Sequence, residues 1–175
     1  EFVDDPQYPD SLAAQGASRL LITLRTFSKI YGLAGLRLGF GVADPALVEV
    51  MNRVRQPFNV SSLAQVAALG ALEDDEHVER TRRCNREGMA FLRAELARLG
   101  VEYVPSWANF LLVRVGNGAR VYEVLLREGV IVRPMSVYGF AEHVRVTVGT
   151  AEENVRFIAA LERVCREGVT SAAAF

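Results

Sequence analysis

Several residue types are scarce in this chain of 175 residues, and their scarcity excludes whole classes of protein. The only two cysteines, Cys84 and Cys165, are far apart and have no CxxC spacing, so we expect reduced thiols rather than a disulfide framework. The two histidines, His77 and His143, are isolated and lack metal-ligand spacing, so no metal site is predicted. His77 also lies in the charged run Glu73–His77, which is typical of a solvated surface.

The chain also lacks long apolar runs and a dominant sign of charge. No run approaches the roughly 20 apolar residues that a membrane-spanning helix needs. The 20 Lys and Arg residues nearly balance the 21 Asp and Glu residues, which excludes the broad basic face of a nucleic-acid-binding protein. The acidic opening Glu1–Asp5 is not typical of a signal peptide. We therefore expect a cytoplasmic protein that acts on small molecules, with no nucleic-acid or membrane partner.

Lysine is the scarcest of the basic residues. Of the 20 Lys and Arg residues, 19 are arginine and only Lys29 is lysine. Arginine keeps its proton, whereas lysine can lose it and act as an amine nucleophile. Lys29 is therefore either a residue with chemistry that arginine cannot perform or the one surface lysine of an arginine-rich sequence, and composition alone does not separate these readings.

The first part of the chain has the pattern of an α/β domain. Asp44 and Pro45 form a helix-start signal, because Asp caps the helix and Pro suits its first position. Ser61 or Ser62 caps a further helix in the same way. The apolar and polar patterns predict strands over 20–24 and 38–43, a loop with a short helical turn over 25–35, and helices over 45–55 and 62–72.

A long charged helix is predicted over residues 75–99, ended by Gly100. Beyond it, Thr150 and Glu153 form a capping box that opens the last helix. The pattern in this part predicts strands over 101–104, 109–115, 130–133 and 144–148, and helices over 120–128 and 151–165.

Together these elements predict an α/β fold that consists of part of a large domain, a connecting helix and a small domain. Residues 1–75 would form part of a large domain, residues 76–100 a connecting helix, and residues 101–167 a small α/β domain. The tail over 168–175 has no pattern and is expected to fray.

The densest group of chemically useful residues is the segment TFSKIYGLAGLRLGF, residues 26–40. It follows a buried strand, and α/β sheets place ligands at strand ends. Its hydroxyls, amine and guanidinium suit a phosphate held beside a reactive amine. The glycines do not fit a GxGxxG fingerprint, because Asp44 stands where that motif needs Gly or Ala, and no P-loop motif is present.

This segment resembles the lysine signature of fold-type I aminotransferases, [ST]-x-[ST]-K-x-x-G-L-A-G-x-R-x-G-[YF], with Phe40 in place of the commoner Tyr. The resemblance implies pyridoxal 5'-phosphate as cofactor. Lys29 would be the catalytic residue that forms the Schiff base and moves the substrate proton. Thr26, Ser28 and Arg37 would hold the cofactor phosphate.

The later part of the chain is similar to the end of the histidinol-phosphate aminotransferase family. The similarity rests on residues 129–135, the pair Tyr138–Gly139, and the run RVTVGT at 145–150, preceded by Pro105–Phe110. In that family the arginine of the RVTVGT strand binds the anionic end of the substrate. The resemblance therefore implies Arg145 as a substrate-binding residue and Arg133 as a weaker candidate, whereas Arg145 taken alone would be interpreted as an edge-strand charge.

The resemblance covers residues 1 to about 166 and implies the C-terminal half of such an enzyme. The family's Gly-rich phosphate loop, ring-stacking aromatic, Asn and Asp–x–x–Tyr group lie upstream of the segment that this chain matches. Without these groups we expect an incomplete cofactor site, so the chain alone is expected to be inactive and a complete enzyme to be a homodimer.

The function implied is amino-group transfer from histidinol phosphate to 2-oxoglutarate, giving imidazole acetol phosphate and glutamate in histidine biosynthesis. Two alternatives within the fold are an aromatic-amino-acid aminotransferase and a related decarboxylase of a phosphate-bearing substrate. An alternative of another class is a non-catalytic sensor or dimerising module built on the same fold. Lys29 argues against this last reading, although a sensor can keep its cofactor.

Overall fold

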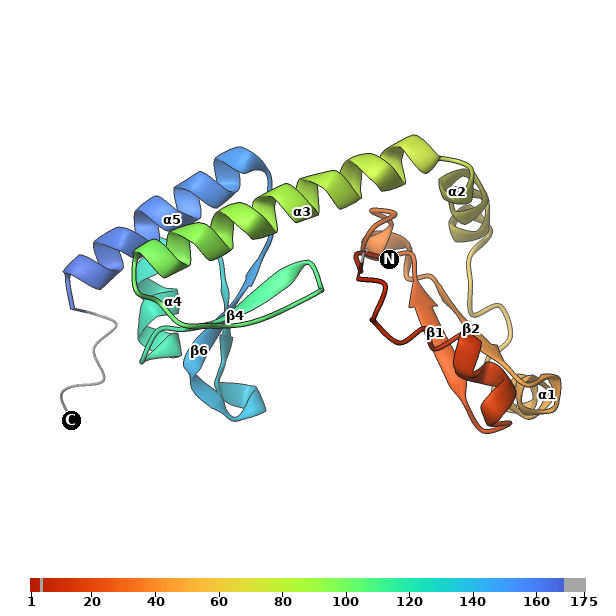
Figure 1. The fold of residues 1–175 in the computed structure, drawn as a ribbon. Coiled ribbons are helices and arrows are strands. Elements are labelled where there is room, and N and C mark those ends of the chain that lie inside the picture. Colours follow the sequence, from red (N-terminus) through yellow and green to blue (C-terminus); the bar gives the residue numbers. More distant parts are fainter. Residues whose placement is uncertain (4, 169–175) are drawn as a thin grey trace. The chain divides into compact units, whose positions relative to one another are not determined.

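The computed structural model describes residues 1–3 and 5–168 (Figure 1). These residues form two compact units. The first comprises Glu1 and the described residues from Val3 to Thr81, and the second comprises Phe2 and the described residues from Arg82 onward. The predicted frayed tail lies outside the described residues except for Gly168.

The first unit is built on an antiparallel pair of strands, β1 (Ile22–Thr26) and β2 (Gly39–Ala43). The loop between them contains the short 3-10 helix η2 (Ala34–Leu36), and another, η1 (Ala13–Ala17), precedes β1. The predicted strand over 20–24 therefore begins and ends two residues too early. Pairing starts at Ile22 opposite Ala43 because β2 ends there, where Asp44 turns the chain into a helix.

Two helices follow, α1 (Pro45–Val54) and α2 (Ser62–Leu72), both within one residue of the predicted bounds. The side chain of Asp44 accepts a hydrogen bond from the Ala46 amide, and that of Ser61 accepts one from the Ala64 amide. Each cap satisfies an amide that has no partner inside its helix, which is why the helices begin where the sequence indicates.

The long helix α3 (Asp75–Arg98) begins at the predicted residue. Asp74 precedes it and accepts a hydrogen bond from the His77 amide at 2.9 Å. The helix ends just before Gly100, whose φ of 69° is typical of the residue that follows a helix. The first turns of α3 belong to the first unit and the remaining turns to the second.

The second unit contains an antiparallel sheet of four strands in the order β3-β4-β6-β5. These strands are β3 (Tyr103–Val104), β4 (Phe110–Arg114), β5 (Arg133–Met135) and β6 (Phe140–Thr147). Helix α4 (Gly118–Arg127) follows β4, the short η3 (Ser136–Tyr138) links β5 to β6, and α5 (Ala151–Arg166) follows β6.

One face of this sheet forms the core of the second unit. Leu111 and Val113 of β4 and Val144 of β6 are fully buried. They pack in one cluster with apolar side chains of α3, α4 and α5, so the three helices cover this face (Figure 1). Because side chains alternate along a strand, Leu112 and Arg145 lie on the opposite face. The core therefore fixes which residues the sheet presents away from the helices.

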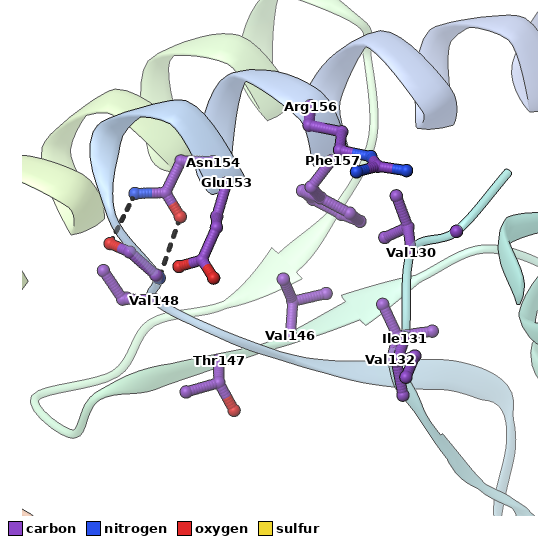
Figure 2. Close-up of a pocket in the computed structure, with 12 residues that line it drawn as sticks. Val130, Ile131, Val132, Val146, Thr147, Val148, Glu153, Asn154, Arg156 and Phe157 are labelled. Carbon is purple, nitrogen blue, oxygen red and sulfur yellow. Dashed lines mark hydrogen bonds between the residues drawn. The ribbon is translucent and has the colours of Figure 1, made fainter.

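The predicted strand over 130–133 is wrong for three of its four residues. Pairing with β6 begins only at Arg133, which lies opposite Arg145. Before that point, residues 130–132 and 146–148 line a cavity of about 490 Å³ that α5 closes with Phe157 (Figure 2). The two segments lie on either side of this cavity, so residues 130–132 do not pair with β6, and only Val132 of the three is buried.

The helices of the second unit are close to their predicted bounds. Helix α4 starts two residues early, because the Asn117 side chain accepts a hydrogen bond from the Arg120 amide. The capping box before α5 is confirmed, since Glu153 N donates to Thr150 Oγ1 and Thr150 N donates to Glu153 Oε2. Among the described residues, no helix is both long and apolar enough to cross a membrane.

Candidate functional site

Three of the residues predicted to hold a phosphate line one cavity of the first unit. Thr26, Ser28 and Arg37 line an open cavity of about 570 Å³ at the end of β1 and the beginning of β2. Gly39 and Phe40 of β2 contribute to the same wall. The structure thus brings together two hydroxyl groups and one guanidinium group, which are donors that suit a phosphate.

Burial of Phe27 explains why Thr26 and Ser28 reach this cavity. The Phe27 ring is 4% exposed and contacts the rings of Tyr31 and Phe40 at centroid distances of 5.0 and 5.9 Å. Its neighbours on either side therefore point the other way. The Ser28 amide donates to Thr26 Oγ1 at 3.0 Å, which fixes the local turn and leaves the Thr26 hydroxyl hydrogen available to a ligand.

Arg37 has an uncommon backbone conformation. Its φ of 55° and ψ of 48° lie in the left-handed region, directly after η2. A non-glycine residue there costs about 1–2 kcal/mol. The exposed side chain donates from Nη1 to the Ala34 carbonyl at 2.8 Å, which leaves its other donors unused by this contact. Strained residues of this kind are concentrated at ligand sites, so the conformation supports a binding role.

Gly39 allows the two strands to approach closely beside the cavity. A Cβ atom at this position would lie 2.7 Å from the carbonyl oxygen of Arg25, a distance that side chains do not tolerate. Gly39 lies opposite Thr26 in the register of the two strands. A side chain here would push β2 away from β1 and widen the space between Thr26 and Arg37.

Lys29 lies on a tight turn directly after Ser28. The Gly32 amide donates to the Lys29 carbonyl at 2.9 Å, and the Leu33 amide donates to the Phe27 carbonyl at 2.9 Å. The Lys29 side chain is exposed, whereas the next side chain, Ile30, is fully buried and anchors the turn. Lys29 is adjacent in sequence to the cavity residues but is not itself part of the cavity wall.

The surface interpretation of His77 is wrong. Its ring is half-buried, and Nε2 lies 3.1 Å from the carbonyl oxygen of Ile30, in the turn that carries Lys29. The charged run before His77 indicated a solvated face, but the first turn of α3 directs this one side chain inward. No pattern in the sequence connects His77 with a loop that lies 47 residues away.

The predicted substrate arginines meet in the second unit. Arg133 of β5 and Arg145 of β6 are directly opposite each other in the register, so both lie on the face away from the helices. The Arg145 guanidinium carbon lies 5.0 Å from the centroid of the Phe110 ring, a cation–π contact that orients it. Its Nε is buried without a hydrogen-bond partner, so this site has an unused donor. Phe110 was not predicted as a site residue.

The six predicted residues therefore form two groups, one in each unit. Thr26, Ser28, Lys29 and Arg37 belong to the first unit, and Arg133 and Arg145 belong to the second. In the part of the chain that the structure describes, no group of three or more His, Cys, Asp or Glu residues is arranged to hold a metal ion.

Comparison with known proteins gives this arrangement a context. The sequence profile described as "Aminotransferase class I and II" matches residues 2–161. Histidinol-phosphate aminotransferase 1 of Nitrosococcus oceani is 56% identical over 168 residues, which cover 95% of this chain and 45% of that protein. The chain thus spans about half the length of the curated relatives it matches.

Two solved structures show the same fold. Histidinol-phosphate aminotransferase from Sinorhizobium meliloti, in complex with pyridoxal-5'-phosphate, has a TM-score of 0.78 and 27% identity, covering 85% of this chain and 42% of that chain. L-threonine-O-3-phosphate decarboxylase from Porphyromonas gingivalis has a TM-score of 0.74 and 28% identity, covering 88% and 49%. They confirm the predicted fold class, an α/β C-terminal part of the pyridoxal-phosphate-dependent transferase fold. The chain belongs to the aminotransferase class I and II family.

Proposed function

We propose that the protein containing this chain is a pyridoxal-phosphate-dependent aminotransferase that moves an amino group from histidinol phosphate to 2-oxoglutarate. The observation that carries the proposal is the cavity lined by Thr26, Ser28 and Arg37, next to the only lysine of the chain, Lys29. The relative named histidinol-phosphate aminotransferase, 56% identical, supports the choice of substrate. The products would be imidazole acetol phosphate and glutamate, in histidine biosynthesis.

The residues of the first unit fit the cofactor's phosphate group. A dianionic phosphate offers acceptors only, and the cavity supplies hydroxyl donors from Thr26 and Ser28 and charged donors from Arg37. Gly39 keeps the wall beside Thr26 free of a side chain. These residues would hold the phosphate, and Lys29, one residue after Ser28, would reach the cofactor's aldehyde carbon.

Lys29 supplies the amine and the proton transfer. When bound, the cofactor supplies an electron sink that stabilises negative charge at the substrate's α-carbon. Arginine could not replace Lys29, because an arginine side chain stays protonated and does not act as an amine nucleophile. The Lys29 Nζ would take the proton from the substrate's α-carbon and hold it for the return transfer.

The two arginines of the second unit would recognise the anionic end of the substrates. Histidinol phosphate carries a phosphate and 2-oxoglutarate carries carboxylates, so both substrates offer anions to the same pair of guanidinium groups. Arg145 contributes an unsatisfied buried donor and is oriented by Phe110, whereas Arg133 is exposed and freer to adjust. We propose Arg145 as the main contact and Arg133 as an additional one.

A decarboxylase of a phosphate-bearing amino acid is the second candidate. The similarity to the Porphyromonas gingivalis L-threonine-O-3-phosphate decarboxylase favours it, with a TM-score of 0.74. The same lysine, phosphate cavity and arginine pair would serve such a substrate. The two candidates differ in whether the α-hydrogen or the carboxylate leaves the α-carbon, so they are separated by products rather than by binding.

The proposed assembly is a cytoplasmic homodimer. Helix α2 supports a partner, because Leu63, Val66 and Leu69 are each at least 65% exposed along it. The neighbouring Phe58 is 100% exposed and adopts a left-handed backbone, with φ of 55°. Light scattering of the full-length protein would measure twice the monomer mass if a second copy covers this surface.

A product assay tests the proposed activity. The full-length protein, loaded with pyridoxal phosphate, would be given histidinol phosphate with 2-oxoglutarate in one assay and L-threonine-O-3-phosphate in a second. Glutamate would be measured in the first and carbon dioxide in the second. We expect glutamate in wild type and none with Lys29→Ala. Carbon dioxide in the second assay without glutamate in the first would favour the decarboxylase, and neither product would contradict both candidates.

A further inference from the structure

The turn that carries Lys29 is held from two sides. Within the turn itself, the Lys29 carbonyl accepts a hydrogen bond from the Gly32 amide, and Gly32 closes the turn with a φ of 70°. The Ile30 side chain is fully buried beneath it. On the other side, the Ile30 carbonyl faces the ring of His77 in the first turns of α3, with 3.1 Å between the oxygen and Nε2.

The surroundings of His77 determine which ring nitrogen carries the hydrogen. Arg80 Nη2 lies 3.3 Å from Nδ1, and a guanidinium group can only donate, so Nδ1 accepts. The hydrogen of the neutral ring is therefore on Nε2, from which it is donated to the Ile30 carbonyl. The hydroxyl oxygen of Thr81 also lies near Nε2, at 3.4 Å.

We infer that His77 is a positioning residue for Lys29: its Nε2–H donates to the Ile30 carbonyl and fixes the turn from which the lysine side chain projects. This inference rests on the proposed role of Lys29. Lys29 is exposed and lies outside the cavity wall, so its direction depends on its backbone rather than on packing of its own side chain. The closest approach of the His77 ring to a Cβ built on Gly32 is 3.8 Å, so the ring also lies directly against the end of this turn.

The test uses the full-length protein loaded with pyridoxal phosphate and compares His77→Leu with His77→Gln. Leucine removes the donor, whereas glutamine carries an N–H donor at nearly the same distance from the backbone. Arg83→Gln is the matched control, because Arg83 is exposed on the same helix. The first readout is hydrogen exchange of the Gly32 amide, which reports opening of the turn without any catalysis. The second is the pH midpoint of the visible absorbance of the Lys29-linked cofactor.

We expect His77→Leu to speed exchange at Gly32 by about five- to tenfold, the factor that corresponds to one ordinary hydrogen bond. The absorbance midpoint should shift as well, and His77→Gln should restore both readouts. Identical exchange and midpoint in His77→Leu and wild type would overturn the inference. Equal exchange and equal midpoints in folded His77→Leu and His77→Gln would also overturn it, because the N–H donor of the side chain would then have no effect.

Two further arms keep the result clear. If His77→Leu does not fold, Arg80→Met leaves the histidine in place and removes the donor at Nδ1, together with the exposed ion pair between Arg80 and Glu76. It should change both readouts in the same direction by a smaller factor, and no change would overturn the inference. If the wild-type protein carries no cofactor on Lys29, the proposed function is wrong. If the wild-type protein carries the cofactor on Lys29 but the His77 variants change neither readout, only the positioning role of His77 is wrong.

Discussion

Arg133 and Arg145 lie directly opposite each other on adjacent antiparallel strands, so two guanidinium groups share one face of the sheet in the second unit. Like charges in this arrangement repel each other and weaken strand pairing. In the described residues neither arginine forms an ion pair with a carboxylate, and Arg145 Nε is a buried donor without a partner. An anion bound between the two guanidinium groups would remove the repulsion.

Replacing Arg145 by alanine should raise the KM for the amino donor and for 2-oxoglutarate together. In the proposed reaction both substrates would use the same site in alternate half-reactions, and a charge-assisted hydrogen bond contributes about 1.5–3 kcal/mol, or about ten- to a hundredfold. Steady-state kinetics of the full-length protein would measure both constants. Arg127→Ala, a change at an exposed arginine of α4, is the control and should leave them unchanged. Lost cofactor with normal substrate constants would show that Arg145 has a structural role.

Two substitutions at Arg37 should separate its strain from its binding role. Arg37→Ala and Arg37→Gly both remove the guanidinium, so each should weaken cofactor binding about ten- to a hundredfold. Glycine tolerates the φ of 55°, so Arg37→Gly should be more stable than Arg37→Ala by about 1 kcal/mol. Fluorescence titration and chemical unfolding measure the two effects. Unchanged cofactor affinity in both variants would show that Arg37 does not contact the phosphate.

Gly118 should tolerate no side chain. A Cβ atom here would overlap the His143 carbonyl oxygen and lie 2.9 Å from that of Ala141, both of which are backbone atoms of β6. Gly118→Ala should therefore destabilise the protein by about 1–3 kcal/mol, by separating α4 from the sheet. Chemical unfolding measures this, with Gly35→Ala as the control, because a Cβ there meets nothing within 4 Å. Equal stability of the two variants would contradict the packing described for α4.

The ion pairs of Glu162 should give stability a dependence on pH. Hydrogen bonding from Arg98, with further help from Arg166, lowers the pKa of the Glu162 carboxyl below its usual range. The contribution is thus fully present above the pKa of the unfolded chain and is lost as pH falls through the lower folded value. Glu162→Gln should be less stable than wild type at neutral pH and equal to it in acid. Glu87→Gln, at an exposed position of α3, should show no such convergence.

The helices and their starts were predictable because their signals are local. Asp44, Ser61 and Thr150 each cap a helix that begins at the predicted residue, since a cap needs only its own neighbours. Strand bounds were less predictable. Residues 130–132 have a strand composition, but the neighbouring segment at 146–148 lies across a cavity from them, and composition contains no information about that distance.

The residues of the candidate site that stand close together in the sequence were predictable, whereas those that meet only in the folded structure were not. Thr26, Ser28 and Arg37 stand within one motif, and the structure places them around one cavity. The roles of His77 and Phe110 come from contacts across the fold, with the Ile30 carbonyl and with Arg145. The assignment of the six site residues to cofactor and substrate stays a prediction that the variants above address.

We propose above all that Lys29 binds the cofactor covalently. The measurement is borohydride reduction of the full-length protein loaded with pyridoxal phosphate, followed by peptide mapping by mass spectrometry. We predict one pyridoxyl group within this chain, on the peptide that contains Lys29, and none in Lys29→Ala, which should also lose the visible absorbance of the bound form. A pyridoxyl group on no residue of this segment, or an unchanged spectrum in Lys29→Ala, would contradict the account.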